Sequence, residues 1–286
     1  MNKYTVKTFD KEFPNDDSCL EWIKNHRYPN GIECPICKKV TKHHKMTGRP
    51  VYECDYCGHQ ISPMANTIFH KSPTSLRTWF HAIFLMSNTR CGISAKQLQR
   101  ETGVTYKTAW RMFKQIRTLL NERYGMFSGM VEVDETYVGG ARQGKRGRGA
   151  SGKTIVAGIV ERQGKVSASV VSDVKSHTLI PMIQEKVAQN TTVFTDEMPS
   201  YNRLEQVGFN HEVINHANKV YVDGEIHTNT IDGFWALVKG GIKGVYHHVS
   251  PEYLDSYVNE YEFRYNHRKD ETPMFQSFLN RIEPHA

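Results

Sequence analysis

Long hydrophobic runs are missing from this sequence. The longest apolar stretches, such as residues 155–160, are far shorter than the about 20 apolar residues that a membrane-spanning helix needs. An apolar segment is also missing near the start, because residues 1–17 are polar and charged, unlike a secretory signal peptide. We therefore expect an intracellular protein in a reducing compartment, without a membrane partner.

Acidic residues are the scarcer charge: 30 Asp and Glu face 37 Lys and Arg, which gives a formal net charge of +7. Such an excess suits a polyanionic partner, and nucleic acid is the commonest one. Internal repeats are absent, and the one biased segment is a Gly- and Arg-rich loop at residues 139–152. The hydrophobic fraction of 38% permits a packed core and argues against general disorder.

Cysteine is rare, and four of the six cysteines form two Cys-x-x-Cys pairs. Cys34 and Cys37 make the first pair, and Cys54 and Cys57 make the second after sixteen intervening residues. Two such knuckles place four thiolates around one tetrahedral ion, the arrangement of a zinc ribbon. Because four thiolates leave no open position, we predict a structural Zn²⁺ that folds this module. A redox or disulfide role is the alternative.

Three regions follow from composition and periodicity. Residues 1–72 hold the zinc ribbon with an N-terminal extension, residues 73–124 read as helices, and residues 125–286 begin with strands and end with helices. In the middle region, a Gly-containing turn separates helices expected at residues 94–101 and 105–124. Helix, turn and helix in this order predict a helix-turn-helix segment that binds DNA.

The second of these helices carries a basic stripe: Lys107, Arg111 and Lys114 recur on one face. The opposite face is an apolar stripe of Trp110, Phe113, Ile116 and Leu120. A recognition helix needs a basic face to approach phosphates and base edges. A solvated helix face has the same pattern, so both interpretations stay open.

The last region predicts an α/β domain. Strands are expected at residues 130–138, 154–161, 165–172, 192–195 and 212–216, and helices at residues 177–188, 229–239 and 251–265. The last helix is expected to have Ser250 as N-cap and Pro251 at its first position.

Three aspartates occupy distinctive places in these elements. Asp134 lies inside an apolar strand, Asp196 ends another, and Asp232 opens a helix. A carboxylate in an apolar strand is costly unless it binds a metal or a partner. Carboxylates from different elements are what two-metal phosphoryl transfer requires, and Mg²⁺ suits such a hard-oxygen site. Lys239, two helical turns after Asp232, would hold a DNA phosphate near the metals.

Each of these residues also has an ordinary structural interpretation. Asp134 would face water on an edge strand, and Asp196 would cap the turn that follows it. Asp232 would form a helix-start capping arrangement with Asn229, three residues earlier. Lys239 would be an ordinary helix C-terminal lysine.

Residues 147–154, GRGASGKT, match the phosphate-binding Walker A pattern. That loop needs a helix after it, whereas residues 155–160 form a β-branched strand run. We therefore expect no nucleotide cofactor. The segment instead reads as a flexible basic loop that touches DNA, with Arg142, Lys145, Arg146 and Arg148 as its contacts.

Several motifs together resemble the zinc-ribbon insertion-sequence transposases related to the Merlin elements, the ISXO2-like group. The motifs are the two cysteine pairs, NTIF at 66–69, VTYKTAWRM at 104–112, VEVDETYVGG at 131–140, TD at 195–196, HTNTIDGFW at 227–235, KGGIKGVYHH at 239–248 and FRYNHR at 263–268. The resemblance runs from about Cys34 to Arg268, which is most of the chain.

The resemblance implies a ribonuclease-H-like mixed-sheet core with a DDE catalytic triad. It implies that Asp134 and Asp196 are the first two catalytic acids, with Asp232 in the third position and Lys239 after it. The family usually has glutamate where this chain has Asp232, and some members rely on the asparagine that matches Asn229. Two Mg²⁺ or Mn²⁺ ions are implied as catalytic cofactors.

The implied activity is hydrolysis at the 3′ ends of a transposon, followed by strand transfer into target DNA. The implied partners are double-stranded transposon ends, target DNA and a second copy of the chain in a homodimer. The implied location is the nucleoid in the cytoplasm of a prokaryote. The alternatives are a decayed or domesticated transposase that only binds DNA, and a stand-alone nuclease on the same core.

Overall fold

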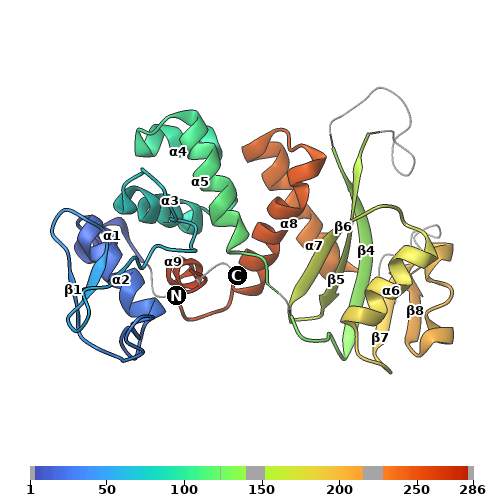
Figure 1. Cartoon of the computed structure of the whole chain (residues 1–286). Coiled ribbons are helices and arrows are strands. Elements are labelled where there is room, and N and C mark those ends of the chain that lie inside the picture. Colours follow the sequence, from blue (N-terminus) through green and yellow to red (C-terminus); the bar gives the residue numbers. More distant parts are fainter. Residues whose placement is uncertain (1–3, 123, 140–151, 215–227, 283–286) are drawn as a thin grey trace. The chain divides into compact units, whose positions relative to one another are not determined.

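The computed structural model describes residues 4–122, 124–139, 152–214 and 228–282 (Figure 1). The chain divides into two compact units: unit 1 is Met1–Leu119 with Asp270–Ala286, and unit 2 is Leu120–Lys269. Among the described helices, none has the length and apolar character needed to cross a membrane.

Unit 1 combines a small sheet with helices. Its elements are α1 (Val6–Glu12), α2 (Asp16–Arg27), β1 (His43–Lys45), β2 (Tyr52–Cys54), β3 (Gln60–Ile61), α3 (Leu76–Asn88), α4 (Ala95–Thr102), α5 (Tyr106–Thr118) and α9 (Met274–Leu279). The strands form an antiparallel sheet in the order β1-β2-β3. Helices α1 and α2 were not expected from the polar N-terminal sequence. The side chain of Thr5 caps α1, and that of Asn15 caps α2.

An aromatic cluster joins the two ends of the chain inside unit 1. The ring of Phe9 on α1 lies 5.1 Å from that of Phe84 on α3 and 5.8 Å from that of Phe275 on α9. All three side chains are buried, and such pairs stabilise a core beyond their buried area. The C-terminal helix therefore belongs to the N-terminal unit, which no local sequence pattern predicts.

The helix-turn-helix segment forms with two corrections. Ser94 caps α4 through its side chain, as expected, and Gly103 ends that helix with a left-handed φ of 70°. Helix α5 ends at Thr118 instead of residue 124. Trp110 is only half-buried, so the predicted apolar stripe is wrong at this position; Ala109 and Met112 fill the core beside Phe113 and Ile116.

Unit 2 is an α/β domain built on a five-stranded mixed sheet. Its main elements are β4 (Met130–Val138), β5 (Thr154–Glu161), β6 (Val166–Val171), α6 (Ser176–Lys186), β7 (Thr192–Asp196), β8 (Asn210–Ile214), α7 (Asn229–Gly241) and α8 (Pro251–Asn266). The strand order is β6-β5-β4-β7-β8. Strand β5 runs antiparallel to β4 and β6, whereas β7 and β8 run parallel to their neighbours. This order and these directions are those of the ribonuclease-H-like fold, so the predicted fold class is confirmed.

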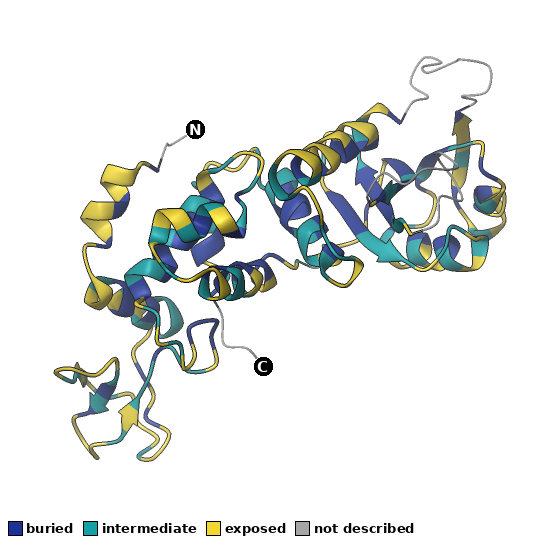
Figure 2. Cartoon of the chain, turned by 90° about the horizontal axis from the view of Figure 1, so that it is seen from above, coloured by how far each residue is buried: buried dark blue, intermediate teal, exposed yellow. Residues whose placement is uncertain are grey.

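Helices cover both faces of this sheet, and Figure 2 shows its strands as largely buried. Val131 and Val133 of β4 pack with Leu179 and Ile183 of α6 on one face. Val138 packs with residues of α7 and α8 on the other. Because side chains alternate along a strand, Glu132 and Asp134 lie on the face that α7 and α8 cover.

Helix α8 covers the outer edge of the sheet. The backbone N–H of Ala168 on β6 donates to the carboxylate of Glu262 at 2.8 Å, and that of Val166 donates to Asn266 at 2.8 Å. Asn266 returns a hydrogen bond to the carbonyl of Val166 at 2.9 Å. Side chains of α8 thus take the place of a sixth strand, which protects an otherwise open edge. Ser250 and Pro251 begin this helix as predicted, although Ser250 makes no side-chain cap.

Candidate active site

Asp134 lies on the central strand of the sheet, so the edge-strand interpretation of this residue is wrong. Its carboxylate accepts a hydrogen bond of 2.9 Å from the indole Nε1–H of Trp235 on α7. Burial raises the pKa of the Asp134 carboxyl to about 7, and repulsion from Glu135, Asp232 and Asp196 adds to the rise. The pKa of Asp134 therefore responds to both of the other predicted site acids, which lie on β7 and α7.

Trp235 reaches Asp134 because the neighbouring strand leaves room for the indole ring. Asp134 pairs across the β4–β5 ladder with Gly158. A Cβ atom at position 158 would lie 2.7 Å from ring atoms of Trp235. Glycine is therefore required here for close approach of α7 to the sheet.

Asp196 is the last residue of β7 and is half-buried. One of its carboxylate oxygens accepts the backbone N–H of Met198 at 3.0 Å. The turn-capping role expected as an alternative is therefore present. A carboxylate has about four acceptor sites, so this one bond does not prevent it from binding a metal ion.

Asp232 lies in the first turn of α7 and is exposed, as are Asn229 and Lys239 on the same helix. The alternative interpretation, a capping arrangement between Asn229 and Asp232, is wrong, because Thr228 is the N-cap residue of α7 and no side-chain cap is present. The hydroxyl of Thr228 donates to the carboxylate of Asp232 at 3.5 Å. In the described part of the chain, the three aspartates do not approach one another as closely as the cysteines do.

The four predicted cysteine ligands come together in unit 1. The four Sγ atoms all lie within 4.8 Å of one another, with 3.4 Å between Cys34 and Cys57 and 3.9 Å between Cys37 and Cys54. Four sulfurs at 2.3 Å from one zinc ion would be about 3.8 Å apart. A hydrogen bond from Thr41 lowers the pKa of the Cys54 thiol, whereas burial and hydrogen bonds to neighbouring thiols raise the pKa of Cys37, so the four thiols share their protons in the absence of a metal ion.

The basic residues predicted to contact DNA differ in their surroundings. Lys107 and Lys114 are exposed on α5. Arg111 instead donates to Ser72 at 3.1 Å and lies 6.0 Å from the ring of Trp79. The loop residues lie outside the described residues: they are Arg142, Lys145, Arg146 and Arg148. Thr154 begins strand β5, so no helix follows the Walker-like stretch.

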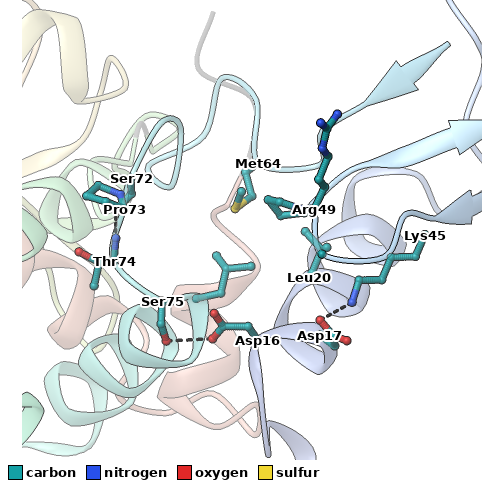
Figure 3. Close-up of a pocket in the computed structure, with 13 residues that line it drawn as sticks. Asp16, Asp17, Leu20, Lys45, Arg49, Met64, Ser72, Pro73, Thr74 and Ser75 are labelled. Atoms are coloured by element: carbon teal, nitrogen blue, oxygen red, sulfur yellow. Dashed lines mark hydrogen bonds and ion pairs between the residues drawn. The ribbon is translucent and has the colours of Figure 1, made fainter.

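A cavity of about 350 Å³ lies in unit 1, between α2, the segment after β1 and the start of α3 (Figure 3). Lys45 forms an ion pair with Asp17, and the hydroxyl of Ser75 donates to Asp16 at 2.9 Å. The acidic groups in its wall thus already have partners in the fold. The lining gives no chemical reason to assign a ligand.

Three further residues lie at the candidate site without having been predicted from sequence: Glu132, Arg162 and Trp235. Glu132 is fully buried on β4, and its carboxylate accepts hydrogen bonds from Arg162 and from the first turn of α7. The signal was available for Glu132, because a carboxylate in an apolar strand is as costly there as at Asp134. No local pattern indicates the partner of Arg162 or of Trp235.

The structure defines a chain with a four-cysteine cluster of zinc-ribbon type in unit 1 and a ribonuclease-H-like sheet in unit 2. Residues 126–266 match the ISXO2-like transposase domain, and residues 14–60 match the transposase zinc-ribbon domain. The chain belongs to the ISXO2-like transposase family.

Two relatives agree with this family. An uncharacterized protein in transposable element ISH50 of Halobacterium salinarum is 26% identical over 273 residues, which cover 89% of this chain and 92% of the relative. An uncharacterized transposase-like protein of Haemophilus influenzae is 34% identical over 102 residues, which cover 36% of this chain and 81% of the relative.

Similar solved structures are more distant. The pre-cleavage Mos1 transpososome has a TM-score of 0.27 at 14% identity, covering 71% of this chain and 79% of that chain. The intasome of simian T-cell lymphotropic virus, in complex with a PP2A regulatory subunit, has a TM-score of 0.30 at 16% identity, covering 62% and 66%. Scores this low support no argument about the site.

Proposed function

We propose that this chain is a DNA transposase that binds transposon ends, hydrolyses their 3′ ends with divalent metal ions and joins them to target DNA. The observation that supports this most is the environment of Asp134. Its carboxyl lies on the central strand of a transposase-family domain, with a pKa raised to about 7 by burial and by repulsion from neighbouring acids that include Asp232 and Asp196. Acids arranged in this way attract cations, because a cation relieves the repulsion.

The ligands of the catalytic ions would be Asp134, Asp196 and Asp232, and Mg²⁺ or Mn²⁺ fits their hard oxygen atoms. Such ions lower the pKa of the attacking water or hydroxyl and stabilise the leaving oxygen. Trp235 holds the Asp134 carboxylate in one orientation. Lys239, exposed on the same helix as Asp232, holds a DNA phosphate, and Asn229 supplements Asp232 in the first turn of α7.

DNA is bound by the zinc ribbon, by helix α5 and by the basic loop. A structural Zn²⁺ on the four cysteines folds the ribbon. The basic face of α5, with Lys107, Arg111 and Lys114, contacts the transposon end together with the basic loop at residues 139–152. Two ends must be brought together, so the complex contains a homodimer on double-stranded DNA, and no nucleotide cofactor is needed.

The second candidate function is a catalytically decayed or domesticated transposase that only binds DNA. The observation that favours it is Asp232, which is one methylene shorter than the glutamate usual in the family. The two candidates share their DNA-binding parts and differ only at the acids.

The test is cleavage and joining of duplex DNA that carries the element's own ends, in Mn²⁺ or Mg²⁺. Wild-type protein is expected to cut and join, whereas Asp134→Asn is expected to lose both and to bind ends normally. Binding by wild-type protein without any cleavage supports the decayed transposase. Cleavage by Asp134→Asn refutes the metal assignment.

A further inference from the structure

Glu132 is a fully buried carboxylate on β4, two residues before Asp134 and on the same face of the strand. An ionised carboxylate in such a place is costly unless hydrogen bonds and an opposite charge compensate for the lost water. Glu132 has both kinds of partner. Its position therefore depends on elements that come from three separate parts of the chain.

The first partner is the beginning of α7. One oxygen of Glu132 accepts the backbone N–H groups of Thr230 at 2.9 Å and Ile231 at 3.0 Å. The other oxygen accepts the hydroxyl of Thr230 at 3.0 Å. The N-cap residue of α7, Thr228, gives no side-chain cap, so the strand supplies the acceptor that the first turn requires. The positive end of the helix dipole favours this arrangement.

The second partner is Arg162, which follows β5. Its Nε–H donates to Glu132 at 2.8 Å, and its guanidinium carbon lies 4.0 Å from the centre of the Phe194 ring. Phe194 is on β7 and pairs with Glu132 in the β4–β7 ladder. Arg162 thus connects the buried carboxylate to the strand that ends in Asp196.

The contacts fall at one spacing relative to the candidate metal ligands. Glu132 is two residues before Asp134, and Phe194 is two residues before Asp196. Thr230 is likewise two residues before Asp232. We call Glu132, with its hydrogen bonds to Arg162 and to the first turn of α7, the clamp. On each element a residue of the clamp or in contact with it lies two positions before the aspartate, so a displacement at the clamp also moves a candidate metal ligand.

A second anchor lies farther along α7, where Trp235 donates to Asp134. Asp232 is located between this anchor and the Thr230 contact with Glu132. A shift of α7 by one residue in register would move Asp232 by about 1.5 Å along the helix axis and rotate it by about 100° around that axis. Such a shift would break the hydrogen bonds at both anchors.

We propose that Glu132 and Arg162 are positioning residues that set the mutual register of β4, β7 and α7, and so the affinity of the catalytic site for divalent metal. This inference rests on the proposed function, because it takes Asp134, Asp196 and Asp232 as the metal ligands. Partners that orient metal ligands usually change metal affinity or activity about 10- to 100-fold when they are mutated.

The test measures Mn²⁺ binding to the full chain, with zinc in its ribbon, by loss of the free-ion signal in electron paramagnetic resonance. The variants are Glu132→Gln and Arg162→Gln. Both oxygens of Glu132 accept N–H groups, so the NH₂ group of the new carboxamide must face an N–H donor from α7 or from Arg162 in either orientation. At least one hydrogen bond is therefore lost. We expect the Mn²⁺ affinity to fall about 10-fold in each variant.

Glu260→Gln is the matched control. Glu260 forms an ion pair with Arg264 on α8 at 2.7 Å, and the side chains are 0% and 10% exposed, as in the Glu132–Arg162 pair. The loss of either buried pair lowers stability, whereas only the clamp lies beside the aspartates. Melting temperatures of all variants separate a fall in stability from a fall in metal affinity, and wild-type affinity in Glu260→Gln is expected.

Folded Glu132→Gln and Arg162→Gln proteins with wild-type Mn²⁺ affinity would overturn the proposal. If Glu132→Gln does not fold, Arg162→Gln alone decides it. Equal Mn²⁺ binding by wild-type protein and Asp134→Asn would instead refute the proposed metal site. In that case hydrogen exchange decides the clamp: faster exchange at Thr230 and Ile231 in Glu132→Gln supports it, and unchanged exchange refutes it.

Discussion

Trp235 donates its indole N–H to the carboxylate of Asp134 over 2.9 Å, joining residues that are 101 positions apart in the sequence. An indole N–H is a donor only, so it satisfies one carboxylate oxygen without competing as a metal ligand. The same ring lies over Gly158, the residue that faces Asp134 on the adjacent strand. The orientation of the predicted first metal ligand therefore depends on packing between α7 and β5.

Trp235→Phe should lower the rate of end cleavage about 10-fold. The substitution keeps an aromatic ring in the core, but it removes the hydrogen bond to Asp134 and leaves a smaller ring, at a cost in stability of about 1–3 kcal/mol. Single-turnover cleavage and urea unfolding measure the two effects.

Gly158→Ala provides the complementary change, because its new Cβ would meet the Trp235 ring and cost about 1–3 kcal/mol by overpacking. The phenylalanine ring lacks the two contacting atoms, so Trp235→Phe should reduce that cost in a double-mutant cycle. Additive effects in the cycle, or a wild-type cleavage rate in Trp235→Phe, would contradict this account.

Asp232 and Asn229 should contribute unequally to cleavage. Asp232→Asn is expected to reduce Mn²⁺-dependent cleavage at least 100-fold, because it removes a charged ligand. Asp232→Glu, which introduces the residue that the family resemblance implies at this position, is expected to retain or increase activity. Asn229→Ala is expected to have a smaller effect. Cleavage assays over a Mn²⁺ series compare the three variants, and a stronger loss in Asn229→Ala would make that residue the third ligand.

Lys107 and Arg111 should behave differently although both lie on the basic face of α5. Lys107→Ala is expected to weaken DNA binding, to reduce the slope of log affinity against log salt by about 1, and to leave the melting temperature unchanged. Arg111→Ala also removes contacts to Ser72 and Trp79, so it should lower the melting temperature as well. Fluorescence anisotropy and thermal melts make the comparison. Unchanged affinity in both variants would show that this face is only solvated.

Removal of zinc should unfold the ribbon and leave unit 2 folded. The sheet β1-β2-β3 is very small, so we expect its stability to depend on a zinc ion bound by the two cysteine pairs. A strong chelator is expected to release one zinc ion per chain and to abolish end binding, while a thermal transition of unit 2 persists. Cys54→Ser should reproduce the effect without chelator, with Cys91→Ser at an exposed position as the control. Full end binding after zinc release would contradict the prediction.

Glu262 should make stability fall as the pH rises. Burial raises the pKa of its carboxyl from the usual 4.5 to about 7, so the folded protein holds this proton more tightly than the unfolded chain. The stabilising contribution is complete below pH 4.5 and is lost as the pH rises to about 7. Glu262→Gln removes the titration and keeps an acceptor for Ala168. Relative to wild type, this variant should gain up to about 3 kcal/mol between pH 4 and pH 8.

Glu252→Gln, at an exposed position on the same helix, is the control for that series. Urea unfolding at each pH gives the difference in unfolding free energy between each variant and wild type. Asp134 also has a raised pKa, but it is present in every variant, so its contribution cancels in these differences. A constant difference between Glu262→Gln and wild type would contradict the raised pKa.

Local signals were sufficient for several elements. Strands β4 and β5 begin and end at the predicted residues, because both segments are rich in the β-branched residues that favour extended backbone. Ser94 caps α4 because a hydroxyl can reach the free amides three residues later. The four cysteines gather because the knuckle spacing itself defines their geometry.

The partners of the site acids were not predictable in the same way. Glu132 meets Thr230 and Ile231 across 98 and 99 positions and Arg162 across 30. Local propensities act over a few residues, whereas these contacts depend on how α7 docks on the sheet. The same limit explains why Trp110 turned out half-buried and why Phe275 packs on Phe9.

The sequence by itself therefore determined the kind of protein, the cysteine cluster and the strands that bear Asp134 and Asp196. Only the tertiary structure decided how these acids are held: Trp235 on Asp134, and Glu132 between Arg162 and the first turn of α7. The physical reason is that a buried carboxylate must find donors wherever packing brings them, and packing joins elements that are distant along the chain.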